Sequence, residues 1–238
     1  MKKRILFTVG VLLSAVSLYC AAENGYLAFL HFLKKPKKGL IKVACVGDSI
    51  TYGCGIKGWF KNNYPSVLGR LLGEDYCVNN YGYSDRTVQH NGDHPYMNER
   101  VYRQSLAFQP DIVLMMLGTN DSKPHNWMGQ EAFIQSYSEM VRSYQKLQSH
   151  PVIFILAPPP AFGDPVKFDI NARVIKEDIC PSLKELAEKS EAIFIDFNTA
   201  FQSRTELFYD GVHPNAAGAQ QLAEALSERI KHYWRNKS

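Results

Sequence analysis

Short apolar runs alternate with longer stretches of regularly spaced apolar positions along most of the chain. The runs are rich in β-branched residues and stop at glycine, proline or polar residues, which is typical of buried strands. The predicted strands are 41–46, 76–80, 111–117, 151–157 and 192–197. Apolar positions at helical spacing predict amphipathic helices over 64–72, 130–147, 174–187 and 216–234. Because strands that alternate with helices and are apolar throughout form parallel sheets covered on both faces, the pattern predicts an α/β fold.

Polar segments that contain glycine or histidine follow three of the predicted strands and precede the last predicted helix. They are 47–51 (GDSIT), 80–84 (NYGYS), 118–121 (GTND) and 210–215 (DGVHPN). A parallel sheet binds ligands at the carboxyl ends of its strands, so we expect these four segments to meet at one edge of the sheet.

Three side chains in these segments can perform nucleophilic catalysis. Ser49 follows a strand, and Gly47 before it permits a tight turn. A serine hydroxyl becomes a useful nucleophile only when a base takes its proton, and His213 can do this near neutral pH. Asp210 stands three residues before His213, close enough to bind its Nδ1 atom and stabilise the imidazolium.

The negative charge that develops on an attacked carbonyl oxygen needs hydrogen-bond donors. Three candidates are the backbone N–H groups of Ser49 and Gly82 and the side-chain amide of Asn120. Taken singly, each of these residues has an ordinary alternative role in a turn, a hinge or a helix cap. Their joint occurrence at strand ends, in this order, favours a catalytic site.

The four segments together resemble the conserved blocks of the SGNH hydrolases, also called the GDSL esterase/lipase superfamily, over 41–230. The resemblance implies Ser49 as nucleophile, Asp210 and His213 as acid and base, and Ser49, Gly82 and Asn120 as oxyanion donors. The second block matches least well. The resemblance also implies a three-layer α/β/α sandwich with a five-stranded parallel sheet, flavodoxin-like in architecture, and a reaction that needs no metal and no cofactor.

Two polar stretches, 84–99 and 122–127, follow catalytic blocks and are expected to overhang the site. They interleave aromatic and polar residues, which suits a sugar better than a lipid, and they are similar to the loops of bacterial carbohydrate acetylesterases. The candidate substrate-binding residues are Asp48, Arg86, His125 and Trp127. We therefore expect hydrolysis of an acetyl ester on a glycan, although ordinary solvated loops are the alternative.

Other functions remain open at this point. A lysophospholipase or thioesterase of the same superfamily would prefer long acyl chains, a glycan-binding module would not hydrolyse esters, and an acyltransferase would transfer the acyl group to a sugar. The glycines of 53–58 match GxGxxG but do not follow a strand directly, so a dinucleotide is not expected. His90, His94 and His125 lack the spacing of a metal site.

The distribution of charge changes the picture at the N-terminus. The 238-residue chain carries a formal charge of +4, but seven of its 27 lysines and arginines lie within the first 38 residues, and the remainder does not indicate nucleic-acid binding. A basic start, an apolar run over 5–19 and two alanines predict a secretory signal cleaved after Ala22. An uncleaved membrane anchor and a lipid on Cys20 are the alternatives.

The predicted organisation is therefore a signal peptide or membrane anchor over 1–22, a tether over 23–39 and a catalytic domain over 40–238. All of the N-terminal alternatives place the domain outside the cytoplasm, either secreted or anchored at the outer face of the cell membrane. Pairing among Cys54, Cys77 and Cys180 is left open by the sequence.

Overall fold

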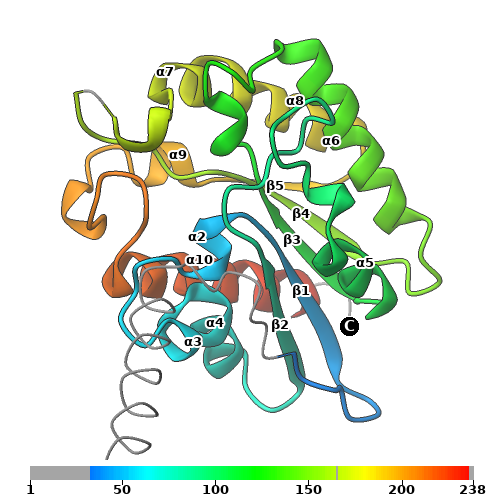
Figure 1. The fold of residues 1–238 in the computed structure, drawn as a ribbon. Helices are drawn as coiled ribbons and strands as arrows, with labels where there is room; N and C mark the ends of the chain where they lie inside the picture. Colours follow the sequence, from blue (N-terminus) through cyan, green and yellow to red (C-terminus); the bar gives the residue numbers. More distant parts are fainter. Residues whose placement is uncertain (1–32, 165, 236–238) are drawn as a thin grey trace, which may run out of the picture.

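The computed structural model describes residues 33–164 and 166–235, which Figure 1 shows as a ribbon. The predicted signal or anchor, 1–22, lies outside the described residues, and so does most of the predicted tether, 23–39. Within the described ranges, no helix has both the length and the apolar character needed to cross a membrane.

In the described part of the chain, five parallel strands form a sheet in the order β2-β1-β3-β4-β5. The strands are β1 (Ile41–Gly47), β2 (Tyr76–Gly82), β3 (Ile112–Met116), β4 (Val152–Ala157) and β5 (Ile193–Asp196). Each of them overlaps a predicted strand, so the predicted five-stranded parallel sheet is confirmed.

Helices cover both faces of the sheet and complete the predicted three layers (Figure 1). One face packs against α4 (Tyr64–Leu72) and α10 (Ala216–Arg235). The other face packs against α5 (Arg100–Ala107), α6 (Gln130–Gln145) and α8 (Cys180–Lys189). The shorter elements are α2 (Ser49–Tyr52), α3 (Trp59–Asn62), η1 (Tyr96–Asn98), η2 (Asn120–Ser122), η3 (Lys167–Asp169), α7 (Ala172–Val174), η4 (Ile175–Ile179), α9 (Phe197–Ala200) and η5 (Thr205–Leu207).

The helix predicted over 174–187 is interrupted. Its first part is α7 followed by η4, a π-helical turn in which the N–H of Cys180 reaches back to the carbonyl of Ile175. Pro181 stands in the first turn of α8 and has no N–H to donate. The wider turn before it accommodates that missing bond, which apolar spacing alone does not reveal.

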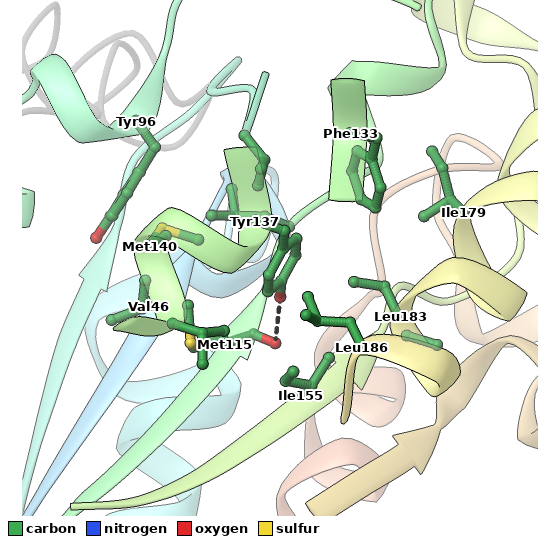
Figure 2. Packing of buried hydrophobic residues seen from close by; sticks show 14 of the residues in the cluster. Val46, Tyr96, Met115, Phe133, Tyr137, Met140, Ile155, Ile179, Leu183 and Leu186 are labelled. Atoms are coloured by element: carbon green, nitrogen blue, oxygen red, sulfur yellow. Dashed lines mark hydrogen bonds between the residues drawn. The ribbon is translucent and has the colours of Figure 1, made fainter. Parts of the chain in front are cut away.

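Both faces of the central strands are buried, which explains their continuous apolar runs. Along β1, Val43 and Cys45 face the cluster with α4 and α10, whereas Ala44 and Val46 face the cluster with α6 and α8. Figure 2 shows the second cluster, where Tyr137 of α6 reaches down to the sheet. Its buried hydroxyl donates a hydrogen bond to the carbonyl oxygen of Met115 at 3.2 Å, so the phenol brings no unsatisfied polar group into the core.

Two glycines at the ends of β1 and β2 let α2 lie directly on the edge of the sheet. A Cβ atom on Gly47 would stand 2.6 Å from the carbonyl oxygen of Met116, and one on Gly82 would stand 2.6 Å from the carbonyl carbon of Thr51. No side chain fits at either position without moving backbone. This close packing fixes where α2, and with it Ser49, begins.

Gly47→Ala is expected to destabilise the fold. Its new methyl group would overlap the backbone of Met116 and the side chain of Thr51, and these would have to move. Overpacking of this kind costs about 1–3 kcal/mol and lowers the melting temperature. The matched control is Gly69→Ala inside α4, where a Cβ atom would make ordinary contacts with the side chains of Val78 at 3.5 Å and Lys34 at 3.8 Å, and where alanine is the better helix former. Thermal denaturation of both variants checks this. A Gly47→Ala protein as stable as Gly69→Ala would contradict it.

Candidate active site

Ser49, His213 and Asp210 lie together at the carboxyl edge of the sheet, as the sequence predicts. Ser49 is the first residue of α2, and its Oγ atom lies 2.9 Å from His213 Nε2 across 164 positions of sequence. On the other side of the ring, His213 Nδ1 lies 2.7 Å from Asp210 Oδ2. Distances and order are those of a nucleophile, its base and the group that orients the base.

The turn from Asp210 to His213 holds the carboxylate firmly. Asp210 Oδ1 accepts hydrogen bonds from the backbone N–H groups of Val212 at 2.9 Å and His213 at 2.8 Å. Burial acts to raise the pKa of Asp210, but its bonds to the ring and backbone of His213 and to Val212 outweigh burial and lower that pKa to about 2. Asp210 is therefore a fixed negative charge beside the imidazole at all ordinary pH values.

A pocket of about 290 Å³ opens beside Ser49 and His213. Asn120, another predicted site residue, lines it at the start of η2, directly after the loop that ends β3. Its side-chain Nδ2 donates to the carbonyl oxygen of Arg86 at 3.2 Å. That bond uses one of the two amide hydrogens and fixes the side chain, which leaves the second hydrogen to serve as a donor in the pocket.

Gly82 does not occupy the position predicted for it. Its N–H donates to Asn80 Oδ1 at 2.8 Å, and the residue packs against α2 instead of lining the pocket. Ser84 and Asp85 line the pocket in its place. Asp85 has a left-handed φ of +63°, and its backbone N–H makes no hydrogen bond within the described residues. The candidate donor from this segment is therefore the N–H of Asp85. The sequence-based prediction chose Gly82 because it is a glycine, three residues before the position that lines the pocket.

Asp48 was expected to bind substrate, and the structure contradicts this. The side chain is buried, and its Oδ1 caps α2 by accepting from the N–H of Ile50 at 2.9 Å. Its Oδ2 is buried without a hydrogen-bond partner among the described residues. Burial raises the pKa of Asp48 to about 6. Its role in the structure is to fix the first turn of the helix that carries Ser49.

The other three predicted substrate-binding residues also lie outside the pocket lining. Arg86 binds Glu99 at 2.7 Å and lies over the ring of Tyr83 at 3.8 Å. His125 Nε2 lies 3.3 Å from a carboxylate oxygen of Asp93, and Trp127 packs against α6. Loop polarity indicated contact with a substrate, but these side chains bind the loops to each other and to the domain.

A buried carboxylate that sequence reasoning passed over, Asp121, anchors the loop after β2. Its two oxygens accept hydrogen bonds from the backbone N–H groups of Val88 and Gln89 at 2.8–3.0 Å. Burial raises the pKa of Asp121 to about 6. Because Asp121 follows Asn120 directly, the loop that carries Asp85 is tied to the residue that supplies the amide donor.

Two aromatic rings contact His213, and neither is among the site residues that the sequence predicts. The Tyr209 ring is stacked on the imidazole with centroids 5.8 Å apart, and the Phe168 ring meets it edge-on at 5.5 Å. Both line the pocket. Phe168 lies in η3, between β4 and α7, in a segment for which the sequence predicts no element. Within the described residues, no group of three or more His, Cys, Asp or Glu side chains is arranged to hold a metal ion.

Comparison with known proteins shows which family the chain resembles. A family model of GDSL-like lipases and acylhydrolases matches residues 45–221. An acetylxylan esterase of Xylanibacter ruminicola is 36% identical over 221 residues, covering 85% of this chain but only 46% of that protein. The chain thus spans about half the length of this relative. An acetylxylan esterase of Geobacillus stearothermophilus is 27% identical over 223 residues, covering 81% of this chain and 95% of that protein.

Solved structures share the fold. A carbohydrate acetylesterase of Sinorhizobium meliloti superposes with a TM-score of 0.66 at 19% identity, covering 81% of this chain and 99% of that one. An aryl esterase of M. smegmatis gives a TM-score of 0.63 at 20% identity, covering 80% and 98%.

Asp48→Asn is expected to stabilise the protein in a pH-dependent way, because asparagine still offers an oxygen to Ile50 but carries no charge. The pKa of Asp48 rises from 3.8 to about 6 on folding, so the folded state binds the proton more tightly. Below pH 3.8 the Asp48 side chain of the wild-type protein is neutral in both the folded and the unfolded state. As the pH rises from 3.8 to about 6, the buried charge lowers the free energy of unfolding by a growing amount.

In urea denaturation, the free energy of unfolding of Asp48→Asn should therefore exceed that of the wild-type protein by more at about pH 7.5 than at about pH 4.5. The exposed Asp75→Asn is the control and should show no such trend. An advantage that shrinks as the pH rises would contradict the assignment of a buried, destabilising carboxylate.

Proposed function

The chain belongs to the GDSL-like lipase/acylhydrolase family, and from that membership we propose that it is a carboxylic ester hydrolase that removes acetyl groups from a carbohydrate through an acyl-enzyme on Ser49. The observation that carries the proposal is the 2.9 Å contact between Ser49 Oγ and His213 Nε2. It is combined with the 2.7 Å contact between His213 Nδ1 and Asp210.

In the first half of the reaction, His213 Nε2 takes the proton of Ser49 as Oγ attacks the ester carbonyl carbon. The C=O bond becomes a C–O⁻ bond, and the oxyanion accepts hydrogen bonds from Asn120 Nδ2 and from the N–H groups of Ser49 and Asp85. His213 then gives its proton to the oxygen of the departing alcohol as the ester C–O bond breaks. Asp210 stabilises the imidazolium between these two transfers.

In the second half, water takes the place of the alcohol. His213 removes one proton from it, the hydroxide attacks the acetyl-Ser49 carbonyl, and the same donors hold the second oxyanion. Collapse releases acetic acid, which keeps the second proton of the water and ionises to acetate in solution, and the proton on His213 returns to Ser49 Oγ. Every proton transfer in the site is made by His213, so the step sequence requires no metal and no cofactor.

The size of the pocket supports a small acyl group. Its volume of about 290 Å³ stands at the lower end of the roughly 300–1,000 Å³ typical of small-molecule sites. The aromatic rings that contact His213, where the alcohol must leave, line part of that space. The space that remains near Asn120 suits acetyl better than a long chain.

A carbohydrate as the alcohol part is supported by two observations. Two of the relatives carry the name acetylxylan esterase. The pocket also combines the exposed rings of Phe168 and Tyr209 with the carboxylate of Asp85, whose side chain is 64% exposed and whose Oδ1 lies 3.7 Å from Lys123 Nζ. Rings stack on the C–H faces of a sugar, and carboxylates accept bonds from its hydroxyls.

Comparison of p-nitrophenyl acetate, butyrate and octanoate tests the acyl preference, with Ser49→Ala as the decisive variant. We expect the highest kcat/KM for acetate and a loss of roughly 10⁴-fold or more in Ser49→Ala, because Ser49 Oγ is the hydroxyl that lies within hydrogen-bond distance of His213 Nε2. The exposed Ser203→Ala is the control and should keep full activity. A preference for octanoate would favour a lipid substrate, and activity that survives in Ser49→Ala would remove the catalytic assignment.

We also propose that the protein works outside the cytoplasm, since the basic start and the apolar run over 5–19 have the layout of a secretory signal. Cleavage after Ala22 is the expected result when the mature protein is analysed by mass spectrometry. An intact N-terminus on a membrane-bound protein would favour the anchor, and an intact N-terminus in the cytoplasm would contradict export.

A further inference from the structure

Two large apolar side chains stand exposed at the mouth of the pocket, both against the catalytic histidine. Phe168 is 54% exposed and Tyr209 is 48% exposed, and in the described residues only two other large hydrophobic side chains, Phe60 and Met128, are as open. Exposed rings at a site rimmed by polar groups mark a surface for binding.

Phe168 is held in an unfavourable backbone conformation. Its φ is +62° and ψ is 26°, and the next residue, Asp169, also has a positive φ of 57°. A left-handed conformation is rare for a bulky aromatic residue and persists only where the surroundings impose it. In most surface loops a glycine or asparagine would occupy such a position.

The surroundings that impose this conformation are parts of the active site. On one side, the N–H of Phe162 donates to the carbonyl of Gly211, in the turn between Asp210 and His213, at 2.7 Å. On the other side, the N–H of Asn171 donates to Ser122 Oγ at 3.0 Å, two residues after Asn120. The segment that carries Phe168 is thus tied at both ends to the catalytic loops.

Tyr209 is held against the same histidine. Its N–H donates to the carbonyl of His213 at 3.2 Å, and the two rings are within 21° of parallel. The Tyr209 hydroxyl lies so close to Gly55 that any Cβ atom there would overlap it. The ring is therefore held between His213 and Gly55, and it lines the pocket.

The chemistry of the reaction decides which part of the ester these rings meet. The acyl carbonyl must lie between Ser49 and the oxyanion donors. The alcohol oxygen must lie at His213 Nε2, because that atom supplies its proton. Groups that flank His213 are therefore next to the alcohol and not next to the acyl group.

We propose that Phe168 and Tyr209 form an aromatic platform for the alcohol part of the ester, which receives the C–H face of a sugar ring beside His213. This rests on the proposed function. The carboxylate of Asp85 also lines the pocket, with Oδ1 3.7 Å from Lys123 Nζ and the side chain 64% exposed. It can accept hydrogen bonds from the sugar hydroxyls, and this distinguishes a sugar from a plain aromatic alcohol.

The test compares two neutral esters with the same acyl group, a mono-acetylated methyl β-xylopyranoside and ethyl acetate. Phe168→Ala should lower kcat/KM for the acetylated xyloside by about three- to ten-fold, mainly through a higher KM, the size expected for one lost stacking contact. Ethyl acetate has no ring to stack, so its kcat/KM should change less than about two-fold. Phe168→Tyr should restore the xyloside value.

Phe60→Ala, which removes an equally exposed ring on α3, is the matched control and should change neither substrate. Tyr209→Ala should act like Phe168→Ala, and Tyr209→Phe should keep xyloside activity because the ring remains. An equal loss on both esters would assign the rings to support of His213, and unchanged kinetics would remove the platform. Wild-type protein that hydrolyses neither ester, or a Ser49→Ala variant that hydrolyses both, would instead overturn the proposed function.

Discussion

The hydrogen bond between Ser49 Oγ and His213 Nε2 is the interaction on which the rest of the site depends, because it joins residues 164 positions apart to within 2.9 Å. The sheet makes this possible by bringing the end of β1 to the loop before α10. Gly47 and Gly82 then let α2 lie directly on the sheet edge, so that the position of Ser49 is set by backbone contacts. An error of one ångström here would separate nucleophile from base.

Buried carboxylates hold the loops around that bond. Asp48 caps the helix of Ser49, Asp121 accepts from the backbone of the loop after β2, and Asp210 accepts from its own turn as well as from His213. Each of them uses backbone N–H groups as partners, which costs no additional side chain and fixes the loop directly. Asp48 and Asp121 keep a raised pKa as the cost of burial, whereas Asp210 has a lowered pKa because its partners outweigh burial.

The sequence predicted the parts that depend on local pattern. Buried strands appear in the sequence as apolar runs. Ser49 stands out because it follows a strand, and Asp210 and His213 stand out because they lie in a polar segment just before the last helix and the reaction demands their residue types. The parts that failed depend on tertiary contacts. The sequence alone does not show that the Asp48 side chain is buried or that Arg86 forms an ion pair with Glu99. It also does not show that Gly82 serves packing while Asp85 adopts a left-handed backbone conformation. Phe168 was not predicted as a site residue for the same reason, because tertiary hydrogen bonds to Gly211 and Ser122 hold its loop at the site.

Rapid-quench mass spectrometry of the protein mixed with p-nitrophenyl acetate tests the central claim most directly. The account predicts one acetyl group on the peptide that contains Ser49, appearing within the first turnover and disappearing once the substrate is consumed. In Asp210→Asn the acetyl group should accumulate far more slowly, since the imidazolium loses its fixed partner. Sustained turnover with no acetyl group on Ser49, or with the group on another residue, would contradict it.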